Sequence, residues 1–141
     1  MPAPQTFRIA SRRQSVSVAR RRVRSTLSGW GVPAELTYCV TLLTSELVTN
    51  AVTHCRVSHA LIEVALTLHG PDLTLEVSDP DRDRPPRLRR TGPDEEGGRG
   101  LALVAELADA WGHRQGPYTK CVWARFTLTG HPGRVDVPTG L

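Results

Sequence analysis

Hydrophobic positions recur along the chain with two different periods, and each period predicts a different kind of element. In residues 15–30 the apolar positions fall every three or four residues, which is the spacing of a helix with one buried stripe. Residues 36–54 repeat that spacing and predict a second helix. In residues 61–69 and 73–77 apolar and polar residues alternate, so these segments predict two strands, joined by the turn residues 69–72.

The remaining patterns complete the predicted order of elements. Residues 6–10 are β-prone and predict an edge strand, and residues 121–128 alternate like a final strand. A third helical stripe covers residues 101–111 and ends at Gly112, and a strand around residues 111–115 is also indicated. Strands adjacent in hairpins, together with these helices, predict an α+β two-layer sandwich. We expect a mixed, mostly antiparallel sheet covered on one face by helices.

Two segments depart from both periods. Residues 80–98 are rich in proline, arginine and carboxylates, and Leu88 is their single aliphatic residue. Structureless loops of this length in a compact domain are usually lids or binding loops, so we expect a lid here. The Gly- and Pro-containing tail, residues 130–141, is expected to be disordered. Residues 1–129 are expected to form one domain, which suits a chain of 141 residues.

The charge is distributed unevenly along the chain. The net charge is +4, but seven arginines precede the first acidic residue, Glu35; from there on, 11 basic and 14 acidic residues give −3. A basic segment on an acidic body can attract nucleic acid or an acidic protein. Because no aromatic residues interleave with these arginines, we expect no direct nucleic-acid partner, and a nucleic-acid-binding regulator is a remote alternative.

Cysteine usage and hydropathy bound the environment of the chain. The three cysteines contain no Cys-x-x-Cys pair, which favours free thiols in a reducing compartment. His54, Cys55 and His59 could suggest a metal site, but no fourth ligand follows at a zinc-site spacing, so this interpretation is disfavoured. No apolar run reaches the ~18 residues of a membrane span. We therefore expect a cytoplasmic domain without membrane contact.

Three polar side chains interrupt otherwise apolar patterns. Asn50 lies seven residues from Leu43 on the second helical stripe, and Glu46 precedes it by one turn. Asp79 has the parity of the apolar residues of its strand. Taken singly, each could simply cap a loop at the rim of the core. Together they predict a polar site between a helix and the end of a strand.

A glycine-rich turn, residues 97–100, precedes the third helical stripe at Leu101. Glycines let backbone amides approach a ligand closely, and a helix N-terminus carries free N–H groups with a partial positive charge. This arrangement suits phosphate, although its spacing matches neither the Walker nor the Rossmann pattern.

These parts, in this order, resemble the GHKL ATPases with the Bergerat nucleotide-binding fold. The resemblance is strongest to their single-domain branch, the anti-sigma-factor serine/threonine kinases and their actinobacterial relatives. Residues 45–54 look like the N-box of that branch, residues 77–79 like its adenine box and residues 98–104 like its second glycine box. Residues 121–124 resemble its closing strand.

The resemblance implies a role for each matching residue. Asn50 would coordinate the Mg²⁺ that bridges the ATP phosphates, and Glu46 would be the catalytic general base. Asp79 would bind the adenine amino group. Many members have a glycine two residues after this aspartate, where this chain has Asp81.

The glycine box would hold the phosphates. Gly98 and Gly100 would let the lid close over them, and the helix start at Leu101 would stabilise their charge. Arg99 could reach a phosphate or face solvent. Lys120, just before the closing strand, is a weaker phosphate candidate.

The resemblance leaves two functions open. One is an ATP-dependent anti-sigma factor that transfers the ATP γ-phosphate to an anti-anti-sigma (STAS-like) partner and also binds a sigma factor. The other is an ATP-binding anti-sigma or scaffold module with little or no turnover, and the changed adenine box favours this alternative. The resemblance also implies that a homodimer is possible.

Overall fold

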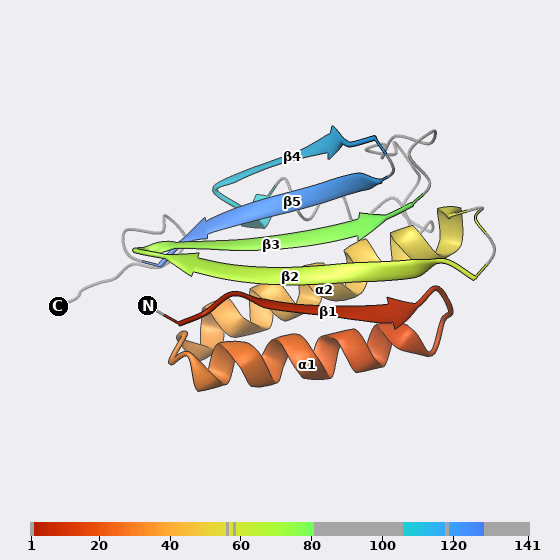
Figure 1. Cartoon of the computed structure of the whole chain (residues 1–141). Coiled ribbons are helices and arrows are strands. Elements are labelled where there is room, and N and C mark those ends of the chain that lie inside the picture. The colour runs from red at the N-terminus through yellow and green to blue at the C-terminus, as the bar shows by residue number, and fades with distance from the viewer. Residues whose placement is uncertain (1, 56, 58, 81–105, 118, 129–141) are drawn as a thin grey trace, which may run out of the picture.

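The computed structural model describes residues 2–55, 57, 59–80, 106–117 and 119–128. These residues form two helices and five strands (Figure 1). In chain order they are β1 (Gln5–Ala10), α1 (Ser15–Gly29), α2 (Ala34–His54), β2 (Leu61–His69), β3 (Asp72–Asp79), β4 (Ala110–Gln115) and β5 (Lys120–Thr127).

The strands form one sheet in the order β1-β2-β3-β5-β4, and every pairing described is antiparallel. The chain leaves β3, returns as the edge strand β4, and then inserts β5 between β4 and β3. The segment after Asp79 therefore begins in the middle of the sheet, beside the start of β5. This order brings two segments about forty residues apart side by side at one end of the sheet.

Both helices pack on one face of the sheet and against each other (Figure 1). The apolar stripe of α1 is fully buried at Ala19, Val23 and Leu27, and α2 buries Val40 and Leu43 in the same way. The facing strand residues are buried as their alternation requires. These residues are Ile62, Val64, Leu66, Leu73, Leu75, Val77, Val122, Ala124 and Phe126.

The end of α1 is fixed by a glycine. The backbone N–H of Val32 donates to the Leu27 carbonyl at 3.0 Å, and that of Gly31 donates to Ser28 at 3.1 Å. This is the Schellman pattern, which needs a left-handed residue, and Gly31 supplies it with φ of 77°. The chain then reverses into α2, so that α1 and α2 lie side by side.

The predicted fold class and most predicted elements are confirmed. The edge strand at residues 6–10, both helices, the hairpin and the last strand lie where the periodicity placed them. One expectation is wrong: the third helical stripe does not extend to Gly112. Helical residues 106–107 are followed by β4, so Trp111 and Gly112 lie in a strand, as the alternative for residues 111–115 indicated. The predicted lid beyond Pro80 and the tail lie outside the described residues, and the single-domain boundary stays a prediction.

Candidate functional site

Asp79 is a buried carboxylate at the end of β3. It continues the alternation of Leu73, Leu75 and Val77, so its side chain lies on the sheet face that the helices cover. Only 5% of the residue is exposed. Carboxylates are rarely buried without a partner, because removing a charge from water is costly.

One partner of Asp79 is Lys120, the first residue of β5. The two residues face each other in the β3–β5 register, and Lys120 Nζ lies 3.9 Å from Asp79 Oδ2. Both side chains are more than nine-tenths buried. At this distance the contact is an ion pair without a direct hydrogen bond. The polar end of β3 therefore holds one carboxylate and one ammonium group inside the fold.

The sequence indicates Lys120 only as a weak phosphate candidate and does not reveal its contact with Asp79. The structure places its ammonium group next to the Asp79 carboxylate. The signal was available in part, because Lys120 has the parity of the buried residues Val122 and Ala124. What the sequence does not give is the register that places β5 against β3.

Glu46 and Asn50 lie on the C-terminal half of α2. Both are half-buried, whereas Leu43 and Leu47 nearby are buried, so the two polar residues occupy the margin of the core rather than its centre. Their spacing of four residues puts them on one side of the helix. Glu46 takes part in an interaction within the chain.

The fold brings these residues to one end of the molecule. In Figure 1 the C-terminal half of α2, the end of β3 and the start of β5 all lie at the same end of the sheet. Because α2 also packs against β3, Glu46 and Asn50 share this end with Asp79 and Lys120. The expected glycine box, Gly98, Arg99, Gly100 and Leu101, lies outside the described residues.

The opposite face of the sheet carries a separate polar cluster. Arg114 donates to Glu76, and this hydrogen bond is the main reason why the pKa of Arg114 is raised. The pKa of the neighbouring Cys121 thiol is also raised, chiefly by burial, while a hydrogen bond with Ser78 acts in the other direction. Cys121 is therefore held in its protonated form, which makes it a poor nucleophile.

Two further sequence expectations concern metals and membranes. Within the part of the chain that the structure describes, no group of three or more His, Cys, Asp or Glu side chains could hold a metal ion. His54, Cys55 and His59 do not form such a group. None of the described helices is both long and apolar enough to cross a membrane.

Comparison with known proteins assigns the family. Residues 9–126 match the model of the histidine kinase-like ATPase domain, so the chain belongs to that family. The predicted resemblance is thereby confirmed. No curated protein sequence matches the chain.

Two solved structures share the fold. One contains the RsbU and RsbW domains of Rv1364c from Mycobacterium tuberculosis, with a TM-score of 0.70 and 20% identity over 90% of this chain. The other is the histidine kinase domain of the blue-light-activated histidine kinase from Erythrobacter litoralis EL346, with a TM-score of 0.56 and 18% identity over 81% of this chain. The chain spans 33% and 61% of these two structures, respectively.

The residues present suit the ligand of this family. Histidine kinase-like ATPase domains bind ATP, typically with Mg²⁺. Mg²⁺ prefers oxygen ligands and is commonly held by one or two side chains together with the phosphates of its substrate. The side-chain oxygen of Asn50 meets that requirement, Glu46 offers a carboxylate one turn away, and the buried Asp79 offers an acceptor for an amino group.

Proposed function

We propose that the chain is an ATP-binding anti-sigma factor with serine/threonine kinase activity. The observation that carries this proposal is the buried Asp79, which ends β3 beside the polar margin of α2 in a histidine kinase-like ATPase domain. The shared fold with a structure containing an RsbW domain supports the choice of branch. A sigma factor and a STAS-like anti-anti-sigma protein are the proposed partners, in the cytoplasm.

Each site residue has a distinct part in this proposal. Asp79 accepts a hydrogen bond from the adenine amino group, and Asn50 holds Mg²⁺, whose charge offsets that of the phosphates. Glu46 accepts the proton of the partner's serine or threonine hydroxyl. The hydroxyl oxygen forms a bond to the γ-phosphorus as the bond between that phosphorus and the bridging oxygen breaks, and ADP leaves with the electron pair. The glycine box at residues 98–101 is proposed to close over the phosphates.

A phosphotransfer assay tests this proposal. The protein is incubated with Mg²⁺, γ-³²P-ATP and a STAS-domain anti-anti-sigma protein, and label on the partner is measured. Glu46→Gln should lower the transfer rate by about 10²–10⁴-fold, the usual contribution of a positioned base, and leave ATP binding intact. Asn50→Ala should weaken both Mg²⁺-dependent ATP binding and transfer.

Thr49→Ala is the matched control, because Thr49 is an exposed residue of the same helix. It should transfer label at the wild-type rate. Transfer that persists in Glu46→Gln would reject Glu46 as the base, and a chain that fails to bind Mg-ATP would reject the whole assignment.

One observation favours a second candidate, an ATP-binding anti-sigma module with little turnover. The proposed adenine-binding carboxylate already has a cationic neighbour, since Lys120 Nζ lies 3.9 Å from it. This ion pair would change the hydrogen-bond acceptors that the Asp79 carboxylate offers to the adenine ring. Under this candidate, ATP binds and a sigma factor is held, but no label reaches the anti-anti-sigma partner.

A further inference from the structure

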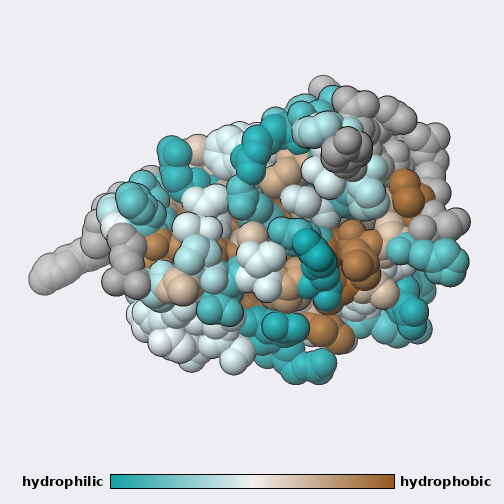
Figure 2. All heavy atoms as spheres, viewed as in Figure 1, coloured by the Kyte–Doolittle hydropathy of each residue, from teal (hydrophilic) through white to brown (hydrophobic). Residues whose placement is uncertain are grey.

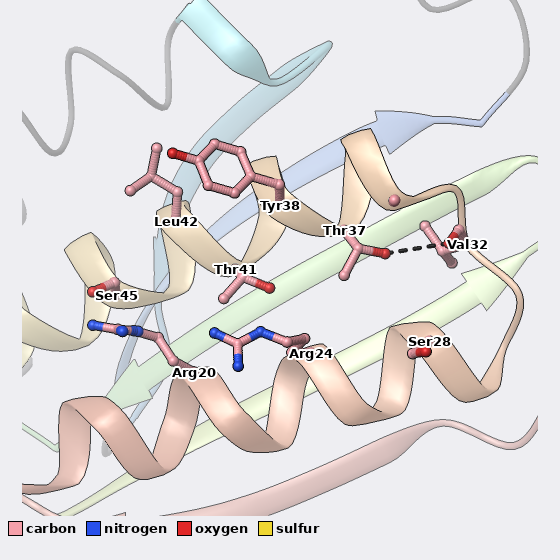
Figure 3. A pocket seen from close by; sticks show the side chains of 10 residues that line it. Arg20, Arg24, Ser28, Val32, Thr37, Tyr38, Thr41, Leu42 and Ser45 are labelled. Atoms are coloured by element: carbon pink, nitrogen blue, oxygen red, sulfur yellow. Dashed lines mark hydrogen bonds between the residues drawn. The ribbon is translucent and has the colours of Figure 1, made fainter.

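A groove runs between α1 and α2, on the side of the helices that faces away from the sheet (Figure 3). Its volume is about 580 Å³. Arg20, Arg24 and Ser28 line it from α1, and Thr37, Tyr38, Thr41, Leu42 and Ser45 line it from α2. Figure 3 shows both arginine side chains reaching from α1 toward α2.

Two arginines give the groove positive charge. Among the residues that the structure describes, no acidic side chain lines the groove, and neither Arg20 nor Arg24 takes part in an ion pair. This contrasts with Arg22 of the same helix, whose guanidinium lies 4.5 Å from the centre of the Phe7 ring. Figure 2 shows the face of the molecule on which the sheet lies, and the groove, which faces away from the sheet, is on the far side of that view.

A buried hydroxyl lies in the same groove. Thr41 is only 7% exposed, and its Oγ1 has no hydrogen-bond partner among the residues that the structure describes. Its neighbours one turn away are satisfied, because Thr37 Oγ1 donates to the Val32 carbonyl and Thr44 Oγ1 donates to the Val40 carbonyl. Because buried polar groups usually have a hydrogen-bond partner, this hydroxyl is unusual, and it lies in the groove beside two arginines without ion pairs.

The groove also offers apolar surface. Leu42 lines it, and the aromatic side chain of Tyr38 stands 69% exposed at its rim. Exposed aromatic side chains beside arginines are common at the centres of protein interfaces. A small inorganic anion would use the charges and leave this apolar surface uncovered.

We propose that this groove binds an acidic helical segment of a partner protein. Arg20 and Arg24 are one turn apart, so a helix lying along the groove would meet them with two carboxylates at the same spacing of four residues. One of these carboxylates would accept a hydrogen bond from Thr41 Oγ1, and a leucine beside it would cover Tyr38 and Leu42. This assignment explains the orphaned hydroxyl, the unpaired arginines and the exposed tyrosine together.

The groove is distinct from the proposed nucleotide site. Five residues separate Thr41 from Glu46, and at about 100° per residue their side chains point about 140° apart around α2. Leu42, which also lines the groove, precedes Glu46 by one turn, so the two sites are neighbours around α2 but share no residue. The inference does not depend on the proposed kinase activity, and occupation of the groove does not require ATP.

An NMR titration tests the proposal. The ¹⁵N-labelled protein is titrated at low salt with an alanine-based helical peptide that carries two glutamates four residues apart and one adjacent leucine. We expect shifts confined to the groove-lining parts of α1 and α2. The same peptide with glutamine in place of glutamate should bind about five- to tenfold more weakly, as the loss of two partly exposed ion pairs predicts.

Charge-matched variants distinguish a specific peptide-binding site from general electrostatic attraction. Arg20→Gln/Arg24→Gln should weaken binding to the level of the glutamine peptide. Arg12→Gln/Arg21→Gln removes the same charge from exposed positions outside the groove and should leave binding unchanged. Equal loss in both pairs would overturn the proposal.

Thr41→Val isolates the hydroxyl. Because Thr41 Oγ1 has no described partner in the fold, this variant should keep or raise the melting temperature while weakening the glutamate peptide severalfold. A lower melting temperature would show that the hydroxyl already has a structural partner and would overturn its role here.

Two further controls compare the peptide with other ligands and compare the groove with the nucleotide site. Duplex DNA or inorganic phosphate that shifts the groove residues at lower concentration than the peptide would replace the proposal with a nucleic-acid or a simple anion site. Asn50→Ala should bind the peptide normally, so that failure of the nucleotide site and failure of the groove give different results.

Discussion

At the scale of single residues, the ion pair between Asp79 and Lys120 carries a large desolvation cost, because both charged side chains are buried. Two charges are removed from water at the end of β3, and their separation of 3.9 Å gives them attraction without a direct hydrogen bond. Such a pair rarely stabilises more than apolar side chains of the same volume, but removing one partner leaves a buried charge uncompensated. Because the pair lies at the candidate site, we propose that it serves ligand binding rather than stability.

The first prediction follows from this pair. Lys120→Met should lower the free energy of unfolding by about 3–5 kcal/mol, because it leaves the Asp79 carboxylate buried without its cation. The double variant Asp79→Asn/Lys120→Met should recover part of that loss. Urea unfolding of the three proteins measures both values. A Lys120→Met protein as stable as wild type would mean that Asp79 does not depend on Lys120.

The second prediction concerns Cys121 and pH. Burial raises the pKa of this thiol, so the folded state favours the protonated form. The resulting stabilisation is complete below the ordinary cysteine pKa of about 8.5 and is lost as pH rises through the higher pKa of the folded state. Wild type should therefore lose more stability between pH 7.5 and 10 than Cys121→Ala, in unfolding curves measured at both limits. Parallel losses in the two proteins would contradict the assignment.

At the scale of elements, the pairing of β4 with β5 depends on a close contact. Gly112 lies directly opposite Trp123 in the register, and a Cβ at Gly112 would come within 2.9 Å of the Trp123 indole. The glycine is therefore required by packing and not by its backbone conformation. This edge strand also has no alternation of apolar and polar residues, so the sequence indicates it only weakly.

The third prediction tests this contact. Gly112→Ala should destabilise the protein by about 1–3 kcal/mol, the usual cost of overpacking, because the rigid indole must move. Gly29→Ala is the matched control. Gly29 is the last residue of α1, a Cβ there meets nothing within 4 Å, and the added helix propensity should make this variant at least as stable as wild type. Thermal unfolding of both variants decides the question, and equal stability would remove the packing argument.

Sequence periodicity predicted the elements that have one clear buried face. The two helices and the strands β2, β3 and β5 each bury a regular stripe, so their sequence and their environment agree. The predicted third helix extends too far along the sequence, because Trp111 continues the helical spacing although it belongs to β4. The inward position of the Asp79 side chain was predicted by the parity of its strand, and its burial confirms that position. Its partner Lys120 depends on the β3–β5 register, a contact between residues 41 positions apart that no local pattern encodes.

At the scale of the whole molecule, α2 contributes to two neighbouring surfaces. Glu46 and Asn50 belong to one, toward the end of β3, and Thr41 and Ser45 belong to the other, toward the arginines of α1. The uneven charge noted in the sequence thus has a structural counterpart, because Arg20 and Arg24 line the groove between the helices. One small domain can in this way present a nucleotide site and a protein-binding groove without overlap.

We propose that this domain binds Mg-ATP at the end of the sheet that holds Asp79, and a thermal shift tests this binding most directly. At a Mg-ATP concentration 100 times the dissociation constant, the folded state should gain about 2.7 kcal/mol and the melting temperature should rise by several degrees. Thr49→Ala should show the same rise, and Asp79→Asn should show little or none. An unchanged melting temperature of the wild-type protein at millimolar Mg-ATP would contradict the account.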